Sequence, residues 1–127
     1  VVDNAVDVTH DTGDEFASLR SLMRETKWYA RDTDAAFLIL HHTSEAVDGN
    51  PCPPRRAIHG KVAQVPALIL TLANIADGRM AVAPVKNRYA KANPDGSMYV
   101  QLSYTPENMY INDLRPAEWQ SVEEVAV

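Results

Sequence analysis

The sequence contains a single cysteine, Cys52, among its 127 residues. One thiol cannot form an intramolecular disulfide, and it cannot supply a zinc site built on two or more thiolates. No apolar run approaches the roughly 18 residues that a membrane-spanning helix needs, and no secretory signal pattern is recognisable. These absences fit a protein of the reducing cytoplasm, which is the localisation that we expect.

Acidic residues outnumber basic ones, 17 against 12, and the formal net charge is −5. This balance argues against a protein that is basic over its whole surface. The charge is nevertheless uneven, because residues 49–94 hold seven cations and a single acid, Asp77. The cations are Arg55, Arg56, Lys61, Arg79, Lys86, Arg88 and Lys91. This asymmetry favours a local basic surface for phosphate groups, although a solvated basic face would have the same composition.

With 46% apolar residues, the chain is long enough for one domain with a single core. A helix is predicted over residues 14–32, where one mainly apolar face repeats at steps of three and four residues. The positions of this face are Phe16, Leu19, Met23, Thr26 and Ala30. Thr12 and Glu15 form a capping-box pattern, so the helix is expected to begin there. A short helical turn is expected over residues 58–65.

Short apolar runs predict the strands of the first half. Residues 35–40 (AAFLIL) and 66–75 (PALILTLANI) carry no charge, which is typical of strands buried on both faces of a parallel sheet. A shorter apolar run ends at Asp3 and is expected to be the end of another strand. Helix and strands alternate in this part of the chain, so the sequence predicts an α/β fold.

The second half predicts antiparallel pairing. Residues 79–87 and 97–104 are expected to form a hairpin around the turn-forming sequence Asn-Pro-Asp-Gly at residues 93–96. Residues 108–114 predict a last short strand. A closing helix is expected over residues 117–127, with a proline at its first turn. The fold is therefore predicted as parallel strands first, followed by an antiparallel hairpin extension.

Polar side chains follow the first two predicted strands. An aspartate such as Asp3, at the carboxyl end of a strand in an open α/β sheet, can hold Mg²⁺, usually through water. His41 and His42 end the second strand. Adjacent strand residues face opposite sides, so only one of the two imidazoles is expected to reach a ligand. A histidine in that place can donate a hydrogen bond to phosphate near neutral pH.

Each of these residues also has a plainer interpretation. Any strand can end in an aspartate, and a packed or solvent-facing histidine is commoner than a ligand-binding one. A metal site is a further alternative, built from His10, Asp11, His41, His42 and His59. The spacing of these five residues matches no familiar ligand pattern, so a metal-dependent hydrolase is the least favoured interpretation.

Lys86 and Arg88 occupy alternate positions of the predicted hairpin, which places both side chains on one face of the strand. Crowded cations repel one another unless an anion lies between them, so polyphosphate or a nucleic-acid backbone would suit them. Arginine in particular offers a planar fork for phosphate oxygens. The alternative is a solvated hairpin tip, which is what we expect for Lys91.

Taken in order, four segments resemble the C-terminal half of a RecA-like ATPase, closest to the DnaB-type replicative helicases and their phage and plasmid relatives. VVDN at residues 1–4 resembles the Walker B strand, and LILHHTSE at 38–45 resembles the sensor strand that follows it. HGKVAQVPALILTL at 59–72 resembles the stretch after the mobile loop. VKNR at 85–88 matches the Lys-x-Arg of the finger hairpin. The resemblance covers residues 1–114.

The resemblance implies a nucleotide site at the ends of the first two strands. Asp3 would coordinate the water shell of Mg²⁺–ATP, with Asn4 beside it. His42, or His41, would sense the γ-phosphate of ATP and relay its loss to the DNA-binding loops. ATP and Mg²⁺ are the cofactors that follow from this resemblance.

The resemblance also implies contacts beyond the chain. Arg88, with Lys86 beside it, would be an arginine finger that reaches ATP bound to the neighbouring subunit of a ring, which we expect to be hexameric. The loop over residues 45–61 would face the channel of the ring. Its contacts with the phosphates of single-stranded DNA would come from Arg55, Arg56, Gly60 and Lys61.

The chain departs from the family at three places. The sensor residue is His where many members carry Gln, and Asn4 follows Asp3 where members carry a second acid. No GxxxxGK[ST] motif occurs in the 127 residues, so the phosphate-binding loop is missing and the chain alone is expected to be inactive. Because it begins at Val1 without Met, we expect a fragment of a larger ATPase in which residues 115–127 form a tail.

The sequence therefore predicts part of a ring-forming DNA helicase that couples ATP hydrolysis to movement on single-stranded DNA, without contacting a membrane. A RecA-like recombinase or a KaiC-like ATPase shares the same sheet and is poorly separated from it. The alternative from another class is an inactive module that keeps only the DNA-binding loop and the subunit-contact hairpin. A fragment without its upstream strands is also expected to expose a sheet edge or an apolar face, and to self-associate.

Overall fold

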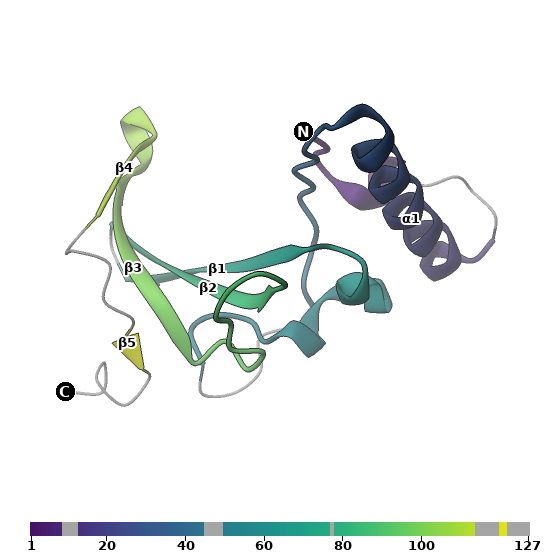
Figure 1. Cartoon of the computed structure of the whole chain (residues 1–127). Helices are drawn as coiled ribbons and strands as arrows, with labels where there is room; N and C mark the ends of the chain where they lie inside the picture. The colour runs from purple at the N-terminus through teal and green to yellow at the C-terminus, as the bar shows by residue number, and fades with distance from the viewer. Residues whose placement is uncertain (9–12, 45–49, 77, 114–119, 122–127) are drawn as a thin grey trace. The chain divides into compact units, whose positions relative to one another are not determined.

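The computed structural model describes residues 1–8, 13–44, 50–76, 78–113 and 120–121, and Figure 1 traces the chain. The chain divides into two compact units. The first comprises Val1–Ser44 with Ile58–Pro66, and the second comprises Glu45–Ala57 with Ala67–Val127. The α-helix belongs to the first unit and the sheet to the second. The molecule therefore contains helix and sheet, as expected of an α/β chain.

The first unit is built on one α-helix, α1 (Glu15–Thr33), which confirms the helix predicted over residues 14–32. Its N-cap is Asp14, whose carboxylate accepts a hydrogen bond of 3.0 Å from the backbone N–H of Ala17. The predicted capping box is therefore wrong, because the chain enters the helix at Asp14 and not at Thr12. Thr12 itself lies outside the described residues.

The inner face of α1 forms the core of this unit. Leu19 and Met23 pack with Ala5 and Val62, and none of these four side chains is more than 4% exposed. Ala5 and Val62 come from two 3-10 helices: η1 (Ala5–Val8) and η3 (His59–Gln64). The latter confirms the helical turn predicted over residues 58–65. Among the described residues, no helix is long and apolar enough to cross a bilayer.

Two segments of the first unit run in parallel near the N-terminus. Val2 forms an isolated parallel bridge with Ile39. The N–H of Val2 donates a hydrogen bond of 2.8 Å to the carbonyl oxygen of Leu38, and the N–H of Leu40 donates one of 2.8 Å to the carbonyl oxygen of Val2. The carboxyl ends of the two segments therefore lie side by side, and the candidate polar residues are at these ends.

Extended parallel strands do not form in the part of the chain that the structure describes. Residues 35–40 were predicted as a strand buried on both faces, and this prediction is wrong. Phe37, Leu38 and Leu40 are 44%, 59% and 43% exposed. A strand loses exposure on both faces only when layers cover both, whereas a single bridge secures only one edge of this segment.

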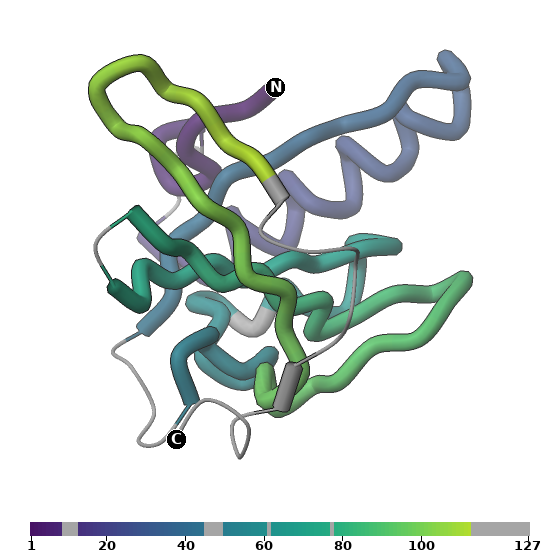
Figure 2. Tube along the Cα trace, turned by 90° about the vertical axis from the view of Figure 1, so that its left-hand side faces the viewer, coloured from purple at the N-terminus to yellow at the C-terminus, as the bar shows by residue number. Residues whose placement is uncertain are grey.

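The second unit is an antiparallel sheet with the strand order β1-β2-β3-β4 (Figures 1 and 2). Its strands are β1 (Leu68–Ala76), β2 (Arg79–Asn87), β3 (Met98–Thr105) and β4 (Tyr110–Asp113). The unit also contains two 3-10 helices, η2 (Arg55–Ala57), which precedes the sheet in the chain, and η4 (Pro106–Asn108), which connects β3 to β4. The predicted hairpin of β2 with β3 is confirmed, and so is the last strand.

A two-residue strand, β5 (Gln120–Ser121), also pairs with β3. The closing helix predicted over residues 117–127 is therefore wrong at these two positions. The rest of that predicted helix lies outside the described residues. A pairing partner so far along the chain leaves no signal in the local sequence, which is why the helical pattern was misleading there.

β1 confirms a strand near residues 66–75, but not the buried parallel strand that was predicted. It is an edge strand and pairs antiparallel with β2. About half of the surface is exposed at alternate positions on one face: Leu68 (51%), Leu70 (49%) and Leu72 (55%). The chain reverses between the strands at Gly78, where φ is +67°. The Asp-Gly pair at residues 77–78 is a strong hairpin signal that the prediction overlooked.

Asn93 organises the turn that follows β2, as the Asn-Pro-Asp-Gly sequence predicts. Its carbonyl oxygen accepts a hydrogen bond of 3.1 Å from the N–H of Gly96, and its side-chain Oδ1 accepts one of 2.9 Å from the N–H of Asp95. The N–H of Asn93 donates to the carbonyl oxygen of Pro84 in β2 at 3.0 Å. The turn is thus fixed both internally and to the sheet.

Residues 50–57 are held against this turn by two hydrogen bonds. The N–H of Arg55 donates to the carbonyl oxygen of Pro94, and Nδ2 of Asn50 donates to that of Asp95, both at 2.8 Å. Gly96 has a φ of +73°, and a Cβ at this position would lie 2.6 Å from the carbonyl oxygen of Cys52. Only glycine permits so close an approach of the two backbones.

Two titratable side chains lie in the interior of the second unit. Cys52 and Tyr99 are both fully buried. Burial raises the pKa of the Cys52 thiol from 9.0 to about 11, against a smaller opposing effect of a hydrogen bond with the backbone of Ala83. Burial also raises the pKa of the Tyr99 hydroxyl. Both groups are therefore held neutral in the folded protein.

We expect the free energy of unfolding to fall as the pH rises from about 9 to about 11. The unfolded thiol ionises near its ordinary pKa, whereas the folded thiol stays protonated up to its raised pKa, so alkaline pH favours the unfolded state. Urea denaturation at a series of pH values measures this slope. Cys52→Ala should flatten the slope even if it also lowers stability at neutral pH, and equal slopes in the two proteins would contradict the expectation.

Candidate functional site

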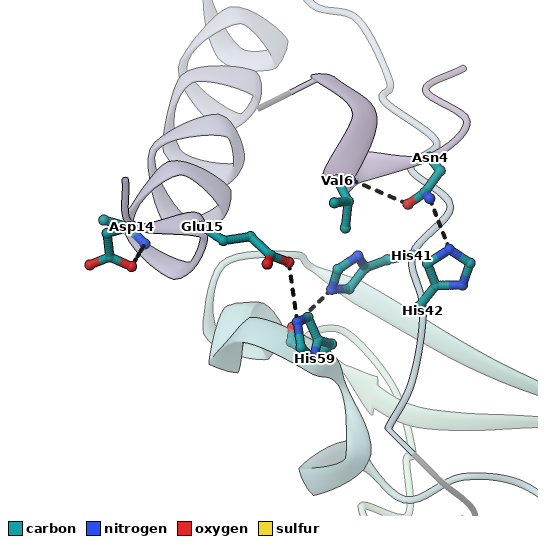
Figure 3. A network of polar contacts seen from close by, with 8 residues as sticks. Asn4, Val6, Asp14, Glu15, His41, His42 and His59 are labelled. Atoms are coloured by element: carbon teal, nitrogen blue, oxygen red, sulfur yellow. Dashed lines mark hydrogen bonds and ion pairs between the residues drawn. The ribbon is translucent and has the colours of Figure 1, made fainter. Parts of the chain in front are cut away.

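The parallel bridge of the first unit brings Asn4 and His42 together (Figure 3). Nδ2 of Asn4 lies 2.8 Å from Nε2 of His42. An amide nitrogen only donates, so Nε2 of His42 accepts and its Nδ1 carries the proton. Oδ1 of Asn4 accepts a hydrogen bond of 3.2 Å from the N–H of Val6 at the start of η1, which fixes the orientation of the amide.

This arrangement leaves His42 with a hydrogen-bond donor to spare. The residue is exposed, and among the described residues no group accepts from its Nδ1–H. Asn4 and His42 are two of the four residues that the resemblance assigns to a nucleotide, and they lie 38 positions apart in the chain. The fold thus presents an imidazole whose Nδ1–H can donate to an anionic ligand.

Asp3 precedes Asn4 at the end of the bridged segment. Its carboxylate is exposed, and it takes part in no hydrogen bond or ion pair with the rest of the described chain. An exposed carboxylate with free oxygens fits the ligand chemistry of Mg²⁺, which prefers oxygen and keeps part of its water shell. The assignment of Asp3 to Mg²⁺ stays a prediction.

His41 turns to different partners. Its Nε2 lies 2.8 Å from the carbonyl oxygen of His59, so Nε2 donates and Nδ1 is left as an acceptor. That Nδ1 is buried and has no hydrogen-bond partner among the described residues. His59 in turn places its Nε2 3.2 Å from Oε1 of Glu15, at the start of α1 (Figure 3). The two adjacent imidazoles diverge, and only His42 lies beside Asn4.

The link between His59 and Glu15 was not predicted from the sequence. From its sequence context Glu15 suggests only a capping box, and the two residues lie 44 positions apart. Glu15 is one of the first residues of α1, so its position depends on where the helix begins. Packing of η3 on α1 then brings His59 to it, and no local pattern announces such a contact.

The alternative metal site receives no support from the described residues. They contain no group of three or more His, Cys, Asp and Glu side chains that could hold a metal ion. His10 and Asp11, two members of the suggested set, lie outside the described residues. His41, His42 and His59 have the partners given above.

The two residues predicted to form the finger belong to the second unit. Lys86 is a half-buried residue of β2 that pairs with Ile69 of β1. Arg88 follows the last residue of β2, and its N–H donates a hydrogen bond of 2.9 Å to the carbonyl oxygen of Ala67. Arg88 is exposed. Its backbone is therefore fixed to the sheet while its side chain remains accessible.

The predicted DNA-binding residues are divided between the two units. Arg55 and Arg56 are exposed and lie in η2 of the second unit. Gly60 and Lys61 lie in η3 of the first unit, and the side chain of Lys61 is outside the described part of the structure. Residues 45–49 of the predicted loop are also outside it.

Gly60 does not fit a DNA contact. It is buried with a φ of +76°, and a Cβ there would lie 2.9 Å from Cδ1 of Leu19 and 3.4 Å from Cδ1 of Phe16. The glycine is needed because η3 packs closely on α1. We therefore correct this assignment and keep Arg55, Arg56 and Lys61 as the candidate contacts.

Comparison with known proteins shows that the chain is similar to two phage proteins, which are both called Gene 65 protein. It is 37% identical over 121 residues to the Gene 65 protein of Mycobacterium phage D29, covering 89% of this chain and 52% of that protein. It is 36% identical over 121 residues to the Gene 65 protein of Mycobacterium phage L5, covering 89% and 45%. No protein-family model matches the sequence. The chain thus spans about half the length of the curated relatives it matches, and both of these relatives come from phages.

Proposed function

We propose that the chain is the C-terminal half of a RecA-like ATPase core of the DnaB type. The complete protein would form a hexameric ring and couple ATP hydrolysis at subunit interfaces to movement on single-stranded DNA. The observation that carries the proposal is the contact between Asn4 and His42 beside the parallel bridge. A Walker B-like segment and a sensor-like segment must lie side by side to act on one nucleotide.

The proposed chemistry is divided among the polar residues of the first unit. When bound, Mg²⁺–ATP would supply the phosphoryl group to be hydrolysed, with the oxygens of Asp3 turned toward the water shell of the metal. His42 has its Nε2 occupied by Asn4, so its Nδ1–H is the donor that can distinguish a γ-phosphate from an empty site. Loss of that acceptor would release the His42 side chain and the segment that carries it.

The residues of the second unit have the complementary roles. Arg88 would donate to the nucleotide of a neighbouring subunit, with Lys86 beside it, and Arg55 and Arg56 would contact the DNA backbone. A RecA- or KaiC-like ATPase would use the same residues at the nucleotide. The second candidate is a non-catalytic DNA-binding or assembly module, in which GxxxxGK[ST] would be missing from the complete protein as well as from these 127 residues.

The test is made on the complete reading frame, in which a Walker A motif is expected upstream of Val1. His42→Ala should lower ATP hydrolysis and abolish its stimulation by single-stranded DNA, while nucleotide binding persists. His42→Gln should retain stimulation, because glutamine also has a donor and is the residue that many members of the DnaB-type family carry here. The readout is phosphate release with and without oligo(dT), alongside binding of a fluorescent ATP analogue.

Three outcomes separate the candidates. Stimulated hydrolysis that depends on His42 supports the ATPase. A complete protein that binds oligo(dT) but neither binds nor hydrolyses ATP would instead be the non-catalytic module. Hydrolysis that is identical in wild type and His42→Ala would remove the contact with Asn4 as a basis for the proposal.

A further inference from the structure

The outward face of α1 carries a line of cations with one exposed tryptophan. At 3.6 residues per turn, five of its side chains fall within an arc of about 100°. They are Arg20, Arg24, Lys27, Trp28 and Arg31, hereafter the basic stripe. The stripe extends for about 16 Å along the helix axis. In the sequence these residues are recognisable only by their spacing of three and four positions.

The stripe lies beside the core-facing side of the helix, with its centre about 110° around the axis from the direction of Leu19 and Met23. Leu19 and Met23 mark the buried side of the helix. Arg24, Lys27 and Arg31 are exposed, and Trp28 is 59% exposed. Arg20 is half-buried, so the side chains of the other four residues are the ones fully accessible to a partner.

No acid neutralises the centre of the stripe. The neighbours of Arg24 at three and four residues are Arg20, Ser21, Lys27 and Trp28, and those of Lys27 are Met23, Arg24, Ala30 and Arg31. Within the described part of the chain, none of the four cations forms an ion pair. Like charges at these spacings destabilise a helix, and a surface helix commonly interleaves them with acids. A bound polyanion would remove the repulsion.

Trp28 indicates which polyanion. Its ring packs edge to face on Tyr29, with 5.0 Å between ring centroids, and both residues are more than half exposed. An exposed tryptophan between cations can stack an unpaired base while the cations bind the backbone. A membrane surface would suit the stripe less well, because the apolar face of α1 is already buried against Ala5 and Val62.

We propose that the basic stripe of α1 binds single-stranded nucleic acid, with the four cations on the phosphates and Trp28 stacked on a base. This surface is distinct from Arg55, Arg56 and Lys61, which the proposed function assigns to DNA. The two assignments share a ligand but no residue, so each can fail alone.

Binding of labelled oligo(dT) to the full 127-residue chain, followed by fluorescence anisotropy at several salt concentrations, tests the inference. Arg24→Gln/Lys27→Gln should weaken binding and reduce the slope of log K against log salt by about 1.4 in magnitude, since each phosphate contact contributes about 0.7 for single strands. Trp28→Ala should weaken binding by about 5- to 100-fold with the slope unchanged, and Trp28→Phe should restore most of the loss.

The controls separate this surface from others. Lys91→Gln, which removes an exposed cation that is expected to be solvated, should leave the affinity nearly unchanged. Circular dichroism checks that α1 remains helical in every variant. If oligo(dT) does not bind, or if only Arg55→Gln/Arg56→Gln weakens binding, the stripe is not the site. If duplex DNA binds as tightly and Trp28→Ala has no effect, the stacking role is overturned.

Discussion

Under the proposed function, Arg88→Ala in the complete protein is expected to lower the rate of ATP hydrolysis by about 10³-fold or more while leaving ATP binding largely intact. An arginine finger stabilises the negative charge that develops on the transferred phosphoryl group, so its effect appears in the chemical step. The backbone of Arg88 is already held by the hydrogen bond to Ala67, so the substitution removes the guanidinium without loosening the strand end. Phosphate release at saturating ATP measures the loss, and equilibrium binding of an ATP analogue measures what remains.

A finger that acts on a neighbouring subunit predicts rescue in mixed rings. Rings assembled from Arg88→Ala subunits and Walker A-mutant subunits should regain part of the activity, because some interfaces then join an intact finger to an intact ATP site. Lys91→Ala is the matched control, since Lys91 is an exposed cation three positions further along and is expected to be solvated. Equal losses for Lys91→Ala and Arg88→Ala, or an absence of rescue, would contradict a finger acting between subunits.

Gly96→Ala is expected to lower the free energy of unfolding by about 2 to 4 kcal/mol. Two costs combine there. The left-handed backbone conformation, with φ at +73°, is strained for any residue that has a Cβ. The new methyl group would also lie 2.6 Å from the carbonyl oxygen of Cys52 and 3.2 Å from that of Pro53, and backbone atoms yield less easily than the end of a side chain. Urea denaturation followed by circular dichroism gives the difference.

Gly78→Ala separates these two costs within the same unit. Gly78 also has a positive φ, at +67°, but a Cβ there would make only an ordinary contact of 3.4 Å with the carbonyl oxygen of Tyr104. This variant should therefore lose only about 1 kcal/mol, from the backbone conformation alone. If both variants lost the same amount, residues 50–57 would not be held against the turn as closely as the structure has them.

The parts of the fold that could be predicted are those with local causes. The helix over residues 14–32 follows from apolar spacing, and the turn at residues 93–96 follows from the hydrogen-bonding habits of asparagine and the conformational freedom of glycine. Strands β2, β3 and β4 follow from apolar runs between turn signals. Such signals need no knowledge of what lies far away in the chain.

The wrong predictions concern apolar runs whose burial was inferred from their composition alone. Residues 35–40 and β1 are equally free of charge, and both were expected to be covered on two faces. Composition does not show how many strands or layers cover a strand. The Asp-Gly pair that follows β1 predicts its antiparallel pairing with β2, and this signal was overlooked. The helix cap was misplaced because two suitable residues, Thr12 and Asp14, stand close together.

The candidate site was predictable to the extent that it depends on strand ends. Asn4 and His42 lie together because both follow apolar segments that run in parallel. The contact of His59 with Glu15 could not be predicted, since it depends on how η3 packs on α1. The burial of Gly60 has the same cause, and a glycine in a basic loop resembles a flexible ligand contact until its neighbours are known.

The hydrogen bonds that hold residues 50–57 to the turn have a mechanical consequence. The link from Arg55 to Pro94 joins backbone to backbone, and the N–H of Asn93 continues it to Pro84 in β2. A pulling force on Arg55 would therefore be transmitted through these backbone hydrogen bonds to β2, which ends just before Arg88. Under the proposed function, a load from DNA on this strand would bear on the placement of Arg88, and the rate of hydrolysis would then depend on force.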